Sequence, residues 1–308
     1  MSIFATSTSA FFERSAQSLT ALRGQAEDLQ NQISTNSKVT KSSDNPLAAS
    51  QLRALARAEA MGTIDTAAAN RATTDLNLTD TALNQFASYV TRAQELATQA
   101  ASSLLPPAQR ASIASELGQI HQGLLGLANA RDSAGHALFG GDSPGDAYQI
   151  NPATGFAEYI GGGAAGQLSL GDGQSVSRSL TGPEFLAFKD PAGADTDLMT
   201  VIKSLSDALA TGAASTAATA QAALASLGNG LEAITSAQTV VGSRLSWIDF
   251  SSERQQAMSE ARASQQEEIG TPELGSALAR LQKLSTVLEA SQASFSKLAN
   301  LSLFEFLR

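Results

Sequence analysis

A seven-residue repeat of apolar positions near the C-terminus constrains the fold of this chain more than any other feature. One series recurs every seven residues, and a second series follows it three positions later. The repeat consists of Leu274, Leu281, Leu288 and Phe295, followed by Ala277, Leu284, Ser291 and Leu298. Two such series form the a/d seam of a coiled coil, so this helix requires a helical partner.

The N-terminal region carries a matching pattern. Spacings that alternate between three and four residues connect Leu19, Leu22, Ala26, Leu29 and Ile33. Neither terminal helix has a core of its own to pack against. We therefore expect the two ends of the chain to pair as a terminal coiled coil.

The last eight residues, LSLFEFLR, are unusually apolar for the end of a chain, where polar residues are normally tolerated. We expect neighbouring copies of the same chain to cover them, and the assembly as a whole to be homo-oligomeric. The predicted assembly interface comprises Leu19, Leu22, Leu29, Ile33, Leu274, Leu281, Leu284, Leu288, Phe295, Leu298, Leu301, Phe304 and Phe306.

The composition favours closely packed helices over a thick globular core. Hydrophobic residues make up 43% of the chain, which is enough for a core, but aromatic residues make up only 5% and alanine is abundant. A net charge of −9 argues against binding to nucleic acid or anionic lipid, because both require a basic face. The absence of cysteine excludes thiol chemistry and disulfides. No signal peptide or membrane-spanning run is recognisable.

Apolar stripes at helical spacing predict further long helices between the two ends. One helix is expected over residues 47–104, and Pro106-Pro107 should turn the chain into a third helix over about 113–127 that packs antiparallel to it. Helical character returns near Asp197, and a long stripe then runs from Leu224 towards Arg262. These stripes are interpreted as intramolecular core.

The segment from about Gly135 to Gly193 has a different character, because glycine and aspartate cluster and the helical period disappears. Short runs in it, AYQI, AEYI, QLSL and SVSRSL, are typical of strands joined by hairpins. The predicted fold is mainly α: a long antiparallel helical rod with a terminal N/C coiled coil and a small β-rich inserted domain. The predicted domains are 1–45 with 271–308, 46–140 with 194–270, and the insertion 141–193.

Two catalytic motifs occur in this segment, and both lack their structural context. Residues 141–145 match G-x-S-x-G, but Pro144-Gly145 indicates a turn where a helix is needed, and both histidines precede Ser143. Gly161, Gly163 and Gly166 match G-x-G-x-x-G, but a strand pattern follows where a phosphate site requires a helix.

Metal chemistry finds no better support in the sequence. His121 and His136 do not have ligand spacing, and both are expected at the surface. Asp142, Asp146 and Asp172 lack the ligand order of an EF-hand. We therefore predict no catalytic, cofactor-binding or metal-binding residues, and a chain that is not an enzyme.

Several segments resemble the bacterial flagellin superfamily, and in particular its hook-associated protein 3 branch, the hook–filament junction proteins. The resemblance covers nearly all of the predicted helices, and the ALFGG stretch distinguishes this branch from flagellin itself. The segments are SSDNPLAAS (42–50), ELATQAASS (95–103), GLANARDSAGHALFGG (126–141), VVGSRL (240–245) and LSLFEFLR (301–308).

The resemblance implies an extracellular structural subunit of the flagellum that is exported by the flagellar type III system without a cleaved signal. Its implied partners are further copies in a ring, the first hook-associated protein, flagellin and an export chaperone, and no cofactor is implied. Two alternatives remain open: a filament flagellin, and a carbohydrate-binding or hydrolytic surface protein that acts through the β insertion.

Overall fold

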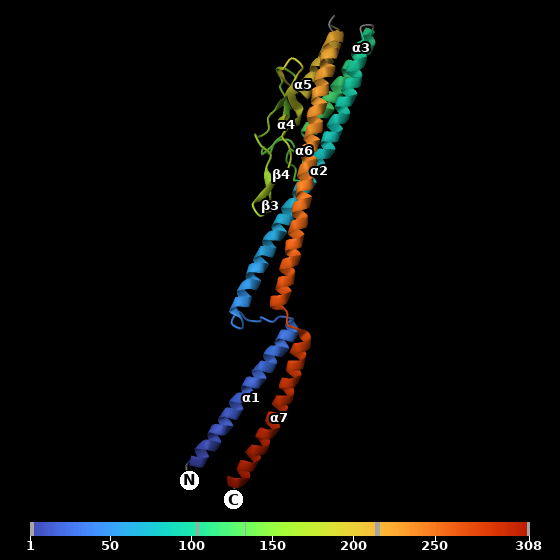
Figure 1. The fold of residues 1–308 in the computed structure, drawn as a ribbon. Helices are drawn as coiled ribbons and strands as arrows, with labels where there is room; N and C mark the ends of the chain where they lie inside the picture. Colours follow the sequence, from blue (N-terminus) through green and yellow to red (C-terminus); the bar gives the residue numbers. More distant parts are fainter. Residues whose placement is uncertain (1–2, 103–104, 133, 213–215, 307–308) are drawn as a thin grey trace. The chain divides into compact units, whose positions relative to one another are not determined.

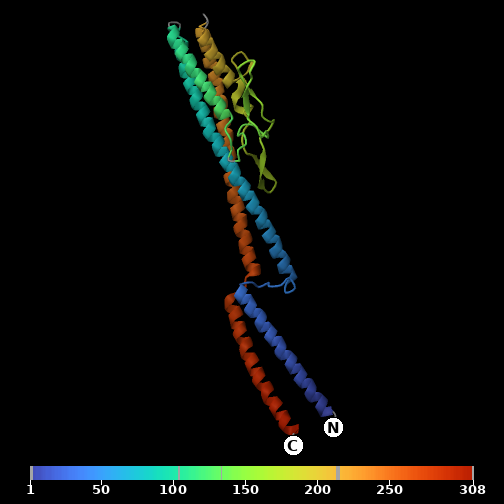
Figure 2. The same ribbon diagram turned by 180° about the vertical axis from the view of Figure 1, so that it is seen from behind.

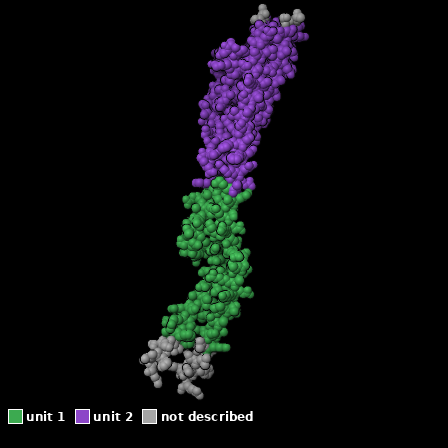
Figure 3. All heavy atoms as spheres, in the orientation of Figure 1, with its two compact units in different colours: residues 1–60, 258–308 green, residues 61–257 purple. Residues whose placement is uncertain are grey.

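The computed structural model describes residues 3–102, 105–132, 134–212 and 216–306, and the side chains of residues 10–297 within these ranges (Figure 1). The fold is mainly α, with small antiparallel strand pairs, as predicted. The chain divides into two compact units, which Figure 3 distinguishes by colour. Unit 1 comprises residues 1–60 and 258–308, and unit 2 comprises residues 61–257.

The described helices include five long ones and two shorter ones, and the strands are all short. In chain order the elements are α1 (Ile3–Thr35), α2 (Pro46–Ala100), α3 (Pro107–Ala128), β1 (Tyr148–Ile150), β2 (Ala157–Tyr159), β3 (Gln167–Gly171), β4 (Gln174–Ser177), α4 (Pro183–Leu186), β5 (Ala187–Lys189), β6 (Asp195–Asp197), α5 (Leu198–Thr211), α6 (Thr216–Gly270) and α7 (Leu274–Phe306).

The start of α2 follows the local chemistry of the linker before it. The side-chain oxygen of Asn45 accepts a hydrogen bond from the backbone N–H of Ala48 at 3.1 Å, and the helix begins at Pro46. Asparagine is a favoured capping residue, and proline is tolerated in the first turn because its missing N–H would be unpaired there. The predicted helix start after the Ser/Thr-rich linker is therefore confirmed.

The core of unit 2 forms where the predicted stripes of α2, α3 and α6 meet. Every member of the α2 stripe is buried: Ala72, Leu76, Thr79, Leu83, Phe86, Val90, Ala93, Ala97 and Ala100. On the facing helices Leu117, Leu124 and Ile234 are fully buried. Outside this core, Arg92 of α2 pairs with Glu116 of α3 at 2.6 Å. The periodicity therefore identified the buried faces correctly.

All four strand runs predicted in the middle segment form strands. They pair as the hairpins β1–β2 and β3–β4, with Tyr148 opposite Tyr159 and Leu168 opposite Val176. The short helix α4 and the hairpin β5–β6 were not predicted. Figure 2 shows the hairpins from the other side. The chain turns at residues 141–145, and β3 follows the glycines of 161–166, so neither catalytic motif has a helix after it.

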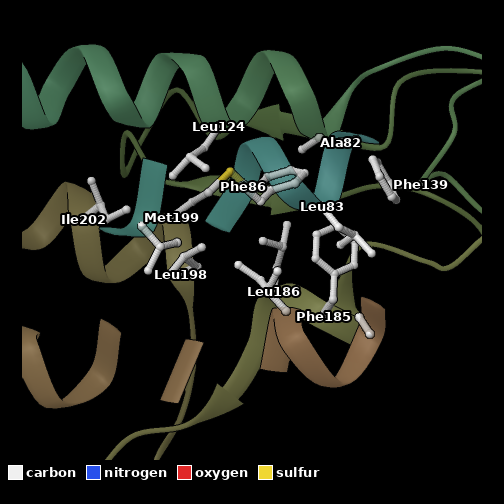
Figure 4. Close-up of a cluster of buried hydrophobic side chains, with 14 of the residues drawn as sticks. Ala82, Leu83, Phe86, Leu124, Phe139, Phe185, Leu186, Leu198, Met199 and Ile202 are labelled. Atoms are coloured by element: carbon white, nitrogen blue, oxygen red, sulfur yellow. The ribbon is translucent and has the colours of Figure 1, made fainter. Parts of the chain in front are cut away.

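Apolar residues of the middle segment belong to the same core as the helices of unit 2. The ring of Phe86 meets Phe139 and Phe185 at centroid distances of 6.0 Å and 5.1 Å, and all three side chains are fully buried (Figure 4). Leu186 from α4, with Leu198 and Met199 from α5, lies in the same cluster. The strands thus cover a helical core. The division into a helical rod and an inserted domain, with its boundaries, stays a prediction.

Candidate assembly interface

The terminal helices α1 and α7 lie side by side and antiparallel within unit 1, as Figures 1 and 2 both show. Near the N-terminal end of α1, the ring of Phe12 packs edge-on against Phe295 of α7, with a centroid distance of 5.4 Å and an interplanar angle of 87°. T-shaped contacts of this kind stabilise aromatic pairs beyond simple burial. The two heptad patterns therefore meet within one chain.

The predicted seam residues face each other but are only partly covered. Ala277 is buried, and the half-buried residues are Leu19, Leu22, Leu29 and Ile33 on α1 and Leu281, Leu284, Leu288 and Phe295 on α7. Leu274, at the start of α7, keeps 47% of its surface exposed. Leu298, Leu301, Phe304 and Phe306 were also predicted and lie outside the described side chains. One pair of helices thus leaves its seam half accessible.

Sequence reasoning missed several apolar residues at these helices. Phe12 extends the α1 series towards the N-terminus, because Phe12, Ser15 and Leu19 continue the spacing of three and four, but the serine concealed the continuation. Phe11 and Val287 lie beside the seam and keep 47% and 40% of their surface exposed. The heptad repeat does not include Phe11 or Val287, because each lies on the side of its helix and outside the seam.

A groove runs along one side of the α1/α7 pair, between the two helices. Its two parts have volumes of about 380 Å³ and 540 Å³ and share Val287. The first part is lined by the small residues Ser15, Ser18, Ala290, Ser291 and Ser294, together with the larger Phe11, Leu19 and Phe295. The second is lined by Leu22, Gln25, Ala279, Arg280, Lys283 and Leu284. We call this feature the α1/α7 groove.

The two histidines of unit 2 differ in how exposed their side chains are. The side chain of His136 is 49% exposed, as predicted, and lies 3.6 Å from a carboxylate oxygen of Asp132. His121, also predicted at the surface, is only 4% exposed, so that prediction was wrong. Burial lowers the pKa of His121, and the nearby Lys203 lowers it further, so both effects favour the neutral ring. No cluster with metal-ligand composition occurs among the described residues.

Asp75 of α2 is the most deeply buried acidic side chain that the structure describes. It keeps only 2% of its surface exposed, and its Oδ1 atom has no hydrogen-bond partner among the described residues. Burial raises the pKa of the Asp75 carboxyl, and the charge of Asp132 raises it further, while Arg178 and Arg71 oppose the rise. A buried carboxylate without full pairing costs stability when it is ionised.

Replacing Asp75 with asparagine should therefore raise the melting temperature at neutral pH. The pKa is higher in the folded chain, so the ionised carboxylate destabilises the fold once the pH exceeds the ordinary aspartate value of about 3.9. This gain in melting temperature should shrink as the pH falls towards that value, because the carboxyl is then protonated in both the folded and the unfolded chain. Thermal melts across this pH range measure the gain, and the exposed Asp249→Asn is the control. A gain that does not depend on pH would contradict the assignment.

The chain is similar to known flagellar proteins. Residues 7–143 match the family model described as the bacterial flagellin N-terminal helical region. Flagellar hook-associated protein 3 of Escherichia coli is 26% identical over 97% of this chain and 98% of its own length. The protein of the same name from Salmonella typhimurium is 29% identical over 62% of this chain and 61% of its own length.

Solved structures show the same fold. A flagellar hook-associated protein from Vibrio parahaemolyticus matches with a TM-score of 0.67 and 19% identity, over 74% of this chain and 100% of its own. The flagellar junction protein FlgL from Legionella pneumophila matches with a TM-score of 0.59 and 13% identity, over 71% and 99% of the two chains. In addition, none of the described helices is long and apolar enough to cross a membrane.

The paired terminal helices and the helical unit with its small hairpins have the fold of solved flagellar hook-associated proteins, and the N-terminal region is similar to that of bacterial flagellins. Along almost the whole of both lengths, the chain is similar to flagellar hook-associated protein 3 of Escherichia coli. The resemblance stated from the sequence is confirmed.

Proposed function

We propose that this chain is the hook–filament junction subunit, an adaptor that links the hook-side junction protein to the flagellin filament. The full-length similarity to hook-associated protein 3 is the observation that carries this proposal. The adaptor would form a ring of identical copies and contact the first hook-associated protein on one side and flagellin on the other. An extracellular location, export without a cleaved signal and an export chaperone belong to the same proposal.

The α1/α7 pair is the proposed assembly interface. Its seam residues are only half-buried in a single chain, so part of the apolar surface that α1 and α7 present stays open to a neighbour. Contact with neighbouring subunits would complete their burial. Each fully covered leucine would then contribute about 1.5–3 kcal/mol relative to an exposed one, so assembly supplies the stability that the single pair lacks.

The alternatives have weaker support. A filament flagellin would be expected to match flagellins along its length, whereas the Escherichia coli protein that matches this chain over nearly its full length is a hook-associated protein. A lectin or hydrolase acting through the β insertion would need a built site there. Phe185 from this segment and Phe139 just before it are instead fully buried, and their rings pack together in the helical core.

A deletion strain provides the decisive experiment. Cells that lack the gene should build hooks to which no filaments attach, and the reintroduced chain should restore filaments, as seen by electron microscopy. The subunit should also be scarce in purified flagella, because a ring contains far fewer copies than a filament. Filaments that attach normally in the deletion strain would refute the junction role, and abundance equal to that of the filament subunit would favour flagellin.

Hydrogen exchange offers a second test of the interface. In the free monomer, residues 10–35 and 275–297 should exchange with little protection, because half-buried seams do not hold a helix pair firmly. Residues 72–100, whose stripe is fully buried, should be strongly protected and serve as the internal reference. After incorporation into flagella, the terminal helices should become protected. Strong protection in the monomer would contradict the proposed role of assembly.

A further inference from the structure

The two sides of the α1/α7 pair carry charges of opposite sign. Arg280 and Lys283 line the groove directly. Arg14 lies on the same side of α1 as Phe11 and Ser18, because residues three or four apart share a helix face. All three basic side chains are exposed. Asp28, three residues after the groove residue Gln25, is an acidic exception on this side. The side of the pair that contains the groove is therefore mainly basic, although the chain as a whole is acidic.

The opposite side is predominantly acidic. Residues two apart on a helix point about 200° away from each other. Glu27 therefore faces away from the groove residue Gln25, and Glu289 faces away from the groove residue Val287. Glu13 is placed in the same way relative to Phe11, and these three glutamates are exposed. Arg23 is the exception on this side, which we call the acidic flank.

The charges on the two sides also lie at matching levels along the helices. Gln25 shares the groove with Arg280 and Lys283, and Glu27 is only about 3 Å further along the helix. Val287 and Ser291 share the groove with Ser15 and Ser18, so Glu289 lies close to the level of Arg14. A second pair placed alongside at the same height would bring glutamates opposite arginine and lysine at both levels.

We propose that the α1/α7 groove receives the acidic flank of a neighbouring copy of this chain. The serines and alanine that line the groove allow a helix to approach closely, and the matching charges set its height. This inference rests on the proposed assembly role and adds to it, because it assigns the contact to the sides of the helix pair and gives it a direction.

The direction of the proposed contact between neighbouring copies has a structural consequence. A groove on one side and a complementary flank on the other make a head-to-tail contact, in which different surfaces of the two copies meet. Such contacts close into rings or continue as helices, whereas contacts between identical surfaces end at dimers. A head-to-tail contact therefore suits a subunit that must both form a ring and continue a tubular structure.

Cysteine cross-linking tests the contact directly, because the chain has no cysteine of its own. One variant carries Glu27→Cys and a second carries Lys283→Cys. When both are produced in cells that lack the unmodified copy, oxidation of their isolated flagella should yield a disulfide-linked dimer that contains one of each variant. Flagella built from either variant alone should give no dimer. Dimers from a single variant, or no dimers in flagella that contain both, would overturn the proposal.

Charge reversal adds an independent readout in otherwise normal cells. Glu27→Lys should reduce incorporation of the chain several-fold, and the combination with Arg280→Glu and Lys283→Glu should restore it. Thr286→Lys adds a positive charge at an exposed position of α7 that is neither a groove residue nor on the acidic flank, so it should leave incorporation unchanged. Equal losses for Glu27→Lys and Thr286→Lys, or no rescue, would refute the contact.

These outcomes separate the contact from the junction role. If the unmodified chain restores filaments to the deletion strain but no mixed dimer forms, the head-to-tail contact is wrong and the junction role stands. If the deletion strain builds attached filaments without the chain, the junction role itself fails.

Discussion

Replacing Phe185 with alanine should lower the free energy of unfolding of unit 2 by about 3–5 kcal/mol, the usual cost of removing a buried aromatic ring. Phe185 is fully buried, and its ring lies 5.1 Å from that of Phe86 and 4.9 Å from that of Phe139. Its loss would leave a cavity where the middle segment meets the helices. Urea denaturation of the full chain, followed by circular dichroism, measures the change.

Phe250→Ala is the matched control for this prediction. The side chain of Phe250 is 58% exposed and stacks on Trp247 at the surface of α6, so the same truncation should cost less than about 1 kcal/mol there. If Phe185→Ala cost no more than Phe250→Ala, the middle segment would not contribute to the helical core. It could then be removed without loss of stability, as expected of an independently folded insertion.

Introducing a carboxylate into the terminal seam, by Leu281→Asp or Leu288→Asp, should abolish incorporation into the flagellum. Both leucines are half-buried in the single chain and become fully enclosed in the proposed assembly. An unpaired carboxylate in such a seam costs several kcal/mol or must take up a proton. Unit 2 does not share this seam and should keep its melting temperature. Immunoblots of purified flagella, together with thermal melts of the soluble chain, measure both effects.

Thr286→Asp controls for the added charge, because Thr286 is exposed on the same helix and lies away from the seam. It should be incorporated normally. If the Leu281→Asp or Leu288→Asp protein also entered flagella at the normal level, the seam would not be the assembly interface. A loss of the unit 2 melting transition in either variant would instead show that the two units depend on each other for stability.

Much of the helical structure was predictable because its signals are local. The stripe from Ala72 to Ala100 repeats with the period of a helix, so any partner must pack on that face, and every stripe residue is buried. Asn45 and Pro46 define a helix start through their own side chains. The heptad residues Leu281 and Leu288 identified the face that α1 covers. Periodicity and capping act within a few turns, and sequence reasoning captures them.

Other features depended on contacts between segments far apart in the chain. His121 appeared to occupy a polar position of its helix, but α3 and α5 pack together and bury it. Residues 187–189 and 195–197 form a hairpin that no alternation of apolar and polar residues predicts. Their pairing depends instead on the turn between them and on the core beneath them.

The sequence by itself therefore determined the long helices, their apolar stripes and the pairing of the two ends. The tertiary structure decided that the middle segment shares a core with the long helices of unit 2, through the contacts of Phe86 with Phe139 and Phe185. It also decided that the helix pair has a basic groove on one side and an acidic flank on the other. The physical reason is that a repeat specifies which face of one helix is apolar. Only the packing of two helices specifies which of their remaining faces lie together.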